Sequence, residues 1–170
     1  LFLSASYAYT NGEFDEFVLL DAQPPNVNVS ISNQAKSGSK IGDYSGFDTA
    51  GNPEHAFVFL GKYQRPLTGS LDWFAQGTAS YQGERYADFS NLVELDDYWL
   101  ATAQVGLEQE KWNVAVYAEN LFDDDTVRFA QEFIDFQTGF QVNTLSFPVA
   151  YFAYLPQPRT VGIRFSYRTP

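Results

Sequence analysis

The sequence has 170 residues, a net charge of −11, and neither cysteine nor methionine. The charge argues against nucleic-acid binding, which requires a basic stripe, and the missing cysteine excludes disulfides and thiolate metal sites. The longest apolar stretch, 149–155, is too short for a spanning helix, whereas an aromatic content of 18% favours strands.

The first predicted strand covers residues 1–10, where Leu, Ala and Tyr alternate with Ser and Thr. An alternative end for this strand runs through 14–20. A polar segment rich in Asn, Ser, Gly and Pro then extends to residue 55 and is predicted to be a long loop. The second strand is predicted over 56–64, and a short turn over 66–70.

The middle of the chain continues the same alternation. Strands are predicted over 72–86, 98–108 and 112–121, because apolar and polar residues alternate in each. A medium loop, 87–97, separates the first two of these strands. A tight turn over 108–111 separates the last two.

A second long loop is predicted over 122–158, with a local hairpin around Thr138-Gly139 because both flanks alternate. The last strand, 160–167, places Val161, Ile163, Phe165 and Tyr167 on one face, and Gly162, Arg164 and Ser166 on the other.

The apolar face of these six strands carries no charge, and long and short connections alternate along the chain. A charge that faces lipid at the bilayer midplane costs about 2–4 kcal/mol, and outer-membrane barrels sort short turns to one side and long loops to the other. The predicted fold is therefore all-β: part of an antiparallel up-and-down transmembrane β-barrel, about six C-terminal strands with long extracellular loops.

The three tryptophans support this orientation. Trp73 and Trp112 begin strands that run in one direction, and Trp99 begins a strand that runs in the other. All three are predicted to face outward near strand ends. Amphipathic rings at both rims are typical of the aromatic girdles of membrane barrels.

No catalytic set is found, because the chain has one histidine and no cysteine, and we expect neither enzyme activity nor a cofactor. The acidic run 123–125 could supply oxygen ligands for Ca²⁺, but its spacing does not match a helix-loop-helix calcium loop. A solvated loop is the preferred interpretation. His55 is interpreted as a loop-to-strand residue rather than a metal ligand.

Several short motifs follow one another along the chain: Asn52-Pro53-Glu54-His55, Leu71-Asp72-Trp73, Trp112-Asn113-Val114, the Asn-Leu-Phe-Asp run within 119–123, and Pro158-Arg159-Thr160. In this order and spacing they resemble the C-terminal barrel portion of TonB-dependent outer-membrane receptors. Gly162, Phe165 and Tyr167 resemble the terminal assembly signal of that family, although 168–170 follow where family members usually end.

The resemblance implies active uptake of a scarce nutrient, most often a ferric siderophore, across the bacterial outer membrane. Residues 1–170 would form the last part of the barrel, with earlier strands and a plug domain outside this sequence. The implied partners are membrane lipid, the rest of the barrel and its plug, a TonB-type energy transducer that contacts the plug, and the barrel-assembly machinery. The alternatives are a passive porin-like channel and a soluble β-sandwich module that binds carbohydrate.

An aromatic stretch within the second long loop supplies the candidate ligand-side residues. It is predicted to line a vestibule, to pack on a neighbouring loop, or to extend the last strand. The candidates are Tyr151, Phe152, Tyr154, Phe136 and Phe140.

Overall fold

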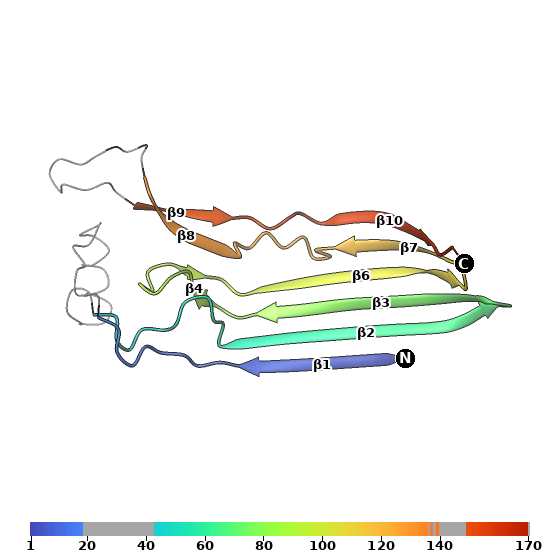
Figure 1. Ribbon diagram of the computed structural model, residues 1–170, viewed down its shortest axis with the longest axis horizontal. Helices are drawn as coiled ribbons and strands as arrows, with labels where there is room; N and C mark the ends of the chain where they lie inside the picture. The colour runs from blue at the N-terminus through green and yellow to red at the C-terminus, as the bar shows by residue number, and fades with distance from the viewer. Residues whose placement is uncertain (19–42, 136, 138, 140–148, 170) are drawn as a thin grey trace.

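The computed structural model describes residues 1–18, 43–135, 137, 139 and 149–169. Six strands form one antiparallel sheet in the order β1-β2-β3-β6-β7-β10 (Figure 1). Two further pairs, β4 with β5 and β8 with β9, form separate two-stranded sheets. The strand bounds are β1 Phe2–Tyr9, β2 His55–Thr68, β3 Leu71–Gln82, β4 Arg85–Tyr86, β5 Glu94–Leu95, β6 Tyr98–Gln109, β7 Trp112–Glu119, β8 Phe129–Ile134, β9 Val149–Tyr154 and β10 Thr160–Tyr167.

The predicted all-β, antiparallel architecture is confirmed, and each of the six predicted strands corresponds to a strand of the large sheet. This sheet is open in the described structure, with β1 and β10 at its two edges. Within the residues that the structure places, no helix has the length and apolar character needed to cross a membrane.

Three predicted boundaries are wrong. β2 continues through Pro66 to Thr68, because a register shift there accommodates the proline, and the turn contracts to Gly69 and Ser70. The third strand ends at Gln82, where the chain leaves the large sheet. The end of its predicted range forms β4 instead, which pairs with β5 of the predicted loop 87–97. Beyond β1, the alternative extension over 14–20 forms only an isolated bridge from Val18 to Asp43 in its described part.

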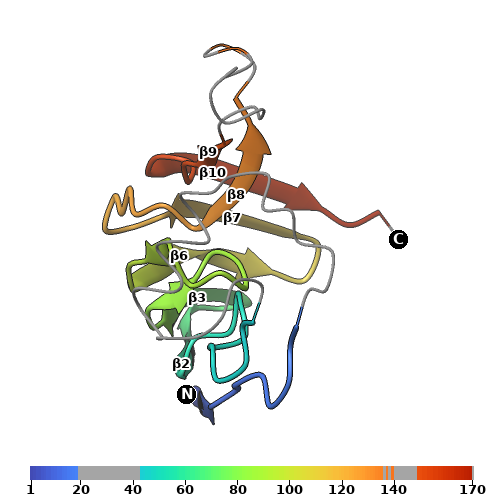
Figure 2. The ribbon, with the colours of Figure 1, turned by 90° about the vertical axis from the view of Figure 1, so that its left-hand side faces the viewer.

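A hairpin within 122–158 is present as the β8–β9 pair, whose last paired residues are Ile134 and Val149. The predicted turn at Thr138-Gly139 is not confirmed, because Thr138 lies outside the described residues. It lies with β4 at one end of the large sheet, here called the loop end, while both chain termini lie at the opposite end (Figures 1 and 2). The aromatic stretch predicted as a loop is therefore largely strand β9, because its alternating residues pair with those of β8.

The register of the large sheet confirms the predicted facing of the side chains. Residues directly opposite each other share a face, and one row across the sheet reads Leu3, Gly61, Gly77, Ala103, Ala118 and Val161. Alternation along each strand predicts the apolar side for all six. We call this side the apolar face and the opposite side the polar face.

Aromatic rings collect near both ends of the apolar face. At the loop end Trp99 lies 5.1 Å from Tyr81 and 6.5 Å from Phe59 between ring centroids. At the other end Trp73 lies 5.2 Å from Tyr63. One charged residue has the register of this face: Arg65, which is opposite Trp73 and lies between the predicted strand 56–64 and the predicted turn 66–70.

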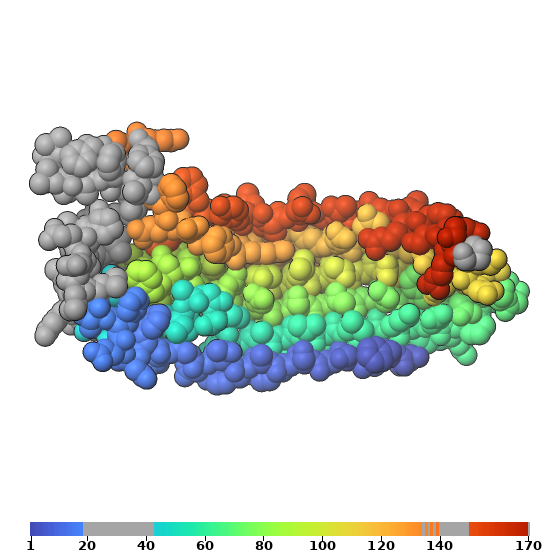
Figure 3. Space-filling model, viewed as in Figure 1, coloured from blue at the N-terminus to red at the C-terminus, as the bar shows by residue number. Residues whose placement is uncertain are grey.

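The apolar face has no covering layer in the described structure. Ile163 is 74% exposed and Val116 is 48% exposed, although both lie inside strands. Figure 3 shows the strands of the large sheet as parallel bands seen from one side. Among the described residues no large side chain is fully buried, so the large sheet does not enclose a core of the kind found in a soluble sandwich.

Candidate functional site

Two distant motifs meet beside the start of β10. Asn120 is 4% exposed and has a left-handed backbone with φ of 49°. Its Nδ2 donates to the carbonyls of Asp124 at 2.9 Å and Gln157 at 3.0 Å, and its Oδ1 accepts from the Asp124 amide at 3.0 Å. The amide of Arg159 donates to Asp123 at 2.8 Å. We call this set the Asn120 clamp, and it joins the ends of the long insertion that carries β8 and β9.

The acidic run 123–125 is part of this clamp. Asp123 accepts the Arg159 amide and lies 3.9 Å from the Arg159 guanidinium, while Asp124 caps the Thr126 amide at 3.0 Å. No group of three or more metal-ligating side chains forms anywhere in the described part of the chain. These contacts tie the acidic run to the start of β10.

The candidate ligand-side residues on β9 face in two directions. Tyr151 is half-buried, and its hydroxyl donates to Asp88 Oδ2 at 2.6 Å. Phe152 and Tyr154 are on the opposite side of the hairpin, 55% and 60% exposed, where they pack on Phe133 and Phe129 of β8. The structure therefore separates Tyr151 from the other two. Phe136 and Phe140 lie outside the described residues.

Tyr151 belongs to a partly buried acidic network that holds the hairpin against the 87–95 segment. Glu132 is directly opposite Tyr151 in the β8–β9 pair, and Asp88 also accepts the Ser90 amide at 2.8 Å. Burial and the Asp88 charge raise the pKa of Glu132 above its ordinary value, and burial and the Asp88 hydrogen bond raise the pKa of Tyr151. The network disfavours negative charge on Glu132.

Two arginines gather around Tyr98 at the loop end of the polar face. The guanidinium carbons of Arg85 and Arg128 lie 5.3 and 5.0 Å from the centre of the Tyr98 ring. Arg85, which is 7% exposed, donates through Nη2 to the carbonyl of Arg128. The sequence analysis missed this cluster. The only available signal was the presence of arginines in an acidic chain with ten Lys and Arg residues in all.

The predicted assembly-signal residues lie on β10, at the edge of the sheet. Phe165 and Tyr167 are exposed on the apolar face. Gly162 is on the polar face beneath Tyr117, and a Cβ at this position would lie 2.7 Å from the Tyr117 hydroxyl. A larger residue here would have to displace the Tyr117 ring, and Arg164 stacks on the same ring at 4.8 Å. Recognition by the assembly machinery stays a prediction.

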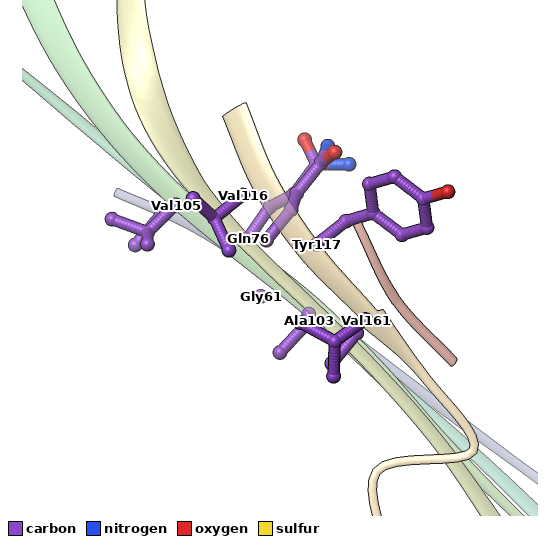
Figure 4. Close-up of a pocket in the computed structure, with 11 residues that line it drawn as sticks. Gly61, Gln76, Ala103, Val105, Val116, Tyr117 and Val161 are labelled. Carbon is purple, nitrogen blue, oxygen red and sulfur yellow. The ribbon is translucent and has the colours of Figure 1, made fainter. Parts of the chain in front are cut away.

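Two hollows line the large sheet and its loop end. A shallow apolar hollow of ≈ 470 Å³ lies over the middle of the sheet, where small residues such as Gly61 and Ala103 leave room between larger ones (Figure 4). A polar hollow of ≈ 240 Å³ at the loop end is lined by Arg85 together with Glu84 and Glu94.

A search against protein-family models finds no match for this chain.

The Asn120 clamp makes a first prediction. Asn120→Ala should lower the free energy of unfolding by about 1–3 kcal/mol, because two carbonyls and one amide lose their buried partner. Urea titration of the full-length protein measures this change. Asn113→Ala, a half-buried asparagine at the far end of the sheet, is the control. An equal effect of both substitutions would contradict the clamp.

The acidic network makes a pH prediction. Because the folded-state pKa of Glu132 is raised above 4.5, hairpin docking is strongest below that pH and weakens as the pH rises through the folded-state pKa. Glu132→Gln should remove this weakening. The pH dependence of hairpin docking is measured by hydrogen exchange of the β9 amides, corrected for intrinsic exchange rates. Glu110→Gln, at an exposed turn residue, should leave the pH dependence of the wild type unchanged.

Proposed function

We propose that this chain forms part of the wall and ligand-side loops of an outer-membrane β-barrel receptor, which takes up a scarce nutrient by TonB-dependent active transport. The observation that carries the proposal is the apolar face of six strands, which has no covering layer in the described structure and no charge between its aromatic ends. The family motifs, met in order along the chain, supply the choice of receptor.

Lipid is the environment that best matches this face. An apolar patch of such extent in water marks a surface that binds protein or membrane. Acyl chains provide an apolar contact along the whole strand length, and β3 and β6, with 12 residues each, exceed the roughly 9–11 residues that a tilted membrane strand needs. The aromatic rings near both ends correspond to the two interfacial girdles.

The open edges of the sheet favour a larger barrel. The outer edges of β1 and β10 carry backbone groups with no partner strand in the described structure. In hydrocarbon each unpaired backbone group costs several kcal/mol, so a membrane sheet must close on itself. Receptors of this family have about 22 strands, and the rest of the barrel would pair with these edges.

The connections also divide by side. The β2–β3 and β6–β7 links are short and lie at the end that carries the chain termini, while the long insertions lie at the loop end (Figure 1). In the proposed receptor the loop end faces outside and captures the ligand. A plug then blocks leakage until an energised inner-membrane partner displaces it. A ferric siderophore is the proposed cargo.

Uptake experiments test the energy requirement. Cells that carry the full-length receptor should accumulate a ⁵⁵Fe-labelled siderophore only when the inner membrane is energised, and an uncoupler should abolish accumulation. Equal uptake with and without the uncoupler would overturn active transport. Steady ion conduction by the purified protein in planar bilayers would favour the passive channel, and purification without detergent would favour the soluble module.

Arginine substitutions test the facing of the strands. Val116→Arg or Ala103→Arg should impair membrane assembly, since each places a charge in lipid at a cost of about 2–4 kcal/mol. Thr102→Arg, on the polar face beside Thr78, should be tolerated better. Assembly is measured as the change in electrophoretic mobility of the receptor in the outer-membrane fraction when the sample is heated. If all three variants assemble equally poorly, the proposed lipid contact is wrong.

A further inference from the structure

We propose that Arg85 and Arg128 form a binding subsite for an oxyanion, a carboxylate or phosphate group carried by the transported ligand. The inference rests on the proposed uptake function and names a chemical class for its cargo. It arises from buried guanidinium nitrogens that have no partner.

Three nitrogens of the two arginines are buried without a hydrogen-bond acceptor in the described structure: Arg85 Nη1, Arg128 Nε and Arg128 Nη2. Nε and Nη2 lie along the same edge of a guanidinium, and their N–H bonds point in nearly parallel directions. This edge matches the two oxygens of a carboxylate or phosphate, which it binds through two parallel hydrogen bonds. The free edge of Arg128 is thus a complete bidentate donor.

The two positive charges are close to each other, and no described carboxylate forms an ion pair with either of them. Both guanidiniums stack on the Tyr98 ring, and Arg85 reaches across to the Arg128 carbonyl. Within the part of the chain that the structure describes, the one ion pair joins Arg159 to Asp123. Glu84 and Glu94 line the hollow beside Arg85, yet neither forms an ion pair with it.

This lack of pairing is costly in a chain with a net charge of −11. A buried donor without an acceptor loses its hydrogen bonds to water and gains none in return, and the cost is larger when the donor is charged. Two like charges beside one ring add repulsion. A bound oxyanion would satisfy the free donors and neutralise charge at once. The geometry therefore favours an anionic group at this place.

The position of the pair agrees with a role in ligand capture. Tyr98 is the first residue of β6, and its hydroxyl donates to Gln82 on the polar face at 3.0 Å. The pair is therefore at the loop end of the face that would line the interior of the proposed receptor. An anionic ferric complex with carboxylate or phosphate groups would supply acceptors for these donors, whereas a neutral oligosaccharide offers them no charge.

Calorimetric titration of the full-length receptor in detergent tests the subsite, with citrate and inorganic phosphate as separate probes at low ionic strength. We expect at least one of the two to bind, and the probe that binds identifies the oxyanion. Arg128→Lys should weaken that binding by about 10- to 100-fold, because lysine keeps the charge but loses the two-donor edge. Arg159→Gln, which removes an exposed arginine outside the cluster, should bind as the wild type does.

Two results would overturn the subsite: no binding of either probe to the wild type, or equal binding to the wild type and Arg128→Lys. Should Arg128→Lys fail to fold, Arg85→Lys replaces it, and the wild-type unfolding temperature with phosphate against chloride at equal ionic strength provides a second measurement. If phosphate does not raise the unfolding temperature above its value in chloride, and citrate does not bind, the proposal is wrong. Because these titrations need no energy source, they fail or succeed independently of the uptake experiment.

Discussion

The structure depends on the alternation of side chains across a paired antiparallel sheet. Each strand of the large sheet presents apolar residues to one side and polar residues to the other, and the register aligns these sides across all six strands. A slip of one residue in any pair would move that strand's whole apolar set to the polar face. Because the apolar residues of all six strands lie on the same side, that side favours an apolar environment.

An apolar environment on that side explains why the large sheet encloses no core in the described structure. The buried residues of the large sheet are small or isolated, such as Ala101, Ala115 and Phe74, while large apolar side chains such as Ile163 stay exposed. A soluble sandwich would bury the same face under a second sheet. Here the described second sheets are short hairpins at the loop end, so they leave the strand interiors uncovered.

The loop end is stabilised by different interactions from those of the large sheet. Its order comes from polar contacts between segments far apart in the chain, as between Tyr151 and Asp88 or between Asn120 and Gln157. Such contacts have fixed geometry and are expensive to leave unmade when buried. They position the β8–β9 hairpin and bring Arg128 beside Arg85. The large sheet thus repeats one alternating pattern, whereas the loop end depends on individual polar contacts.

The sequence alone determined the strands, their facing and the places of Trp73 and Trp99, because a period of two is a local property of the chain. It also located the hairpin inside 122–158. Only the tertiary structure decided the continuation of β2 past Pro66, the separation of Tyr151 from Phe152, and the meeting of Arg85 with Arg128. Each of these depends on what a distant segment places opposite a residue, and alternation carries no information about that partner.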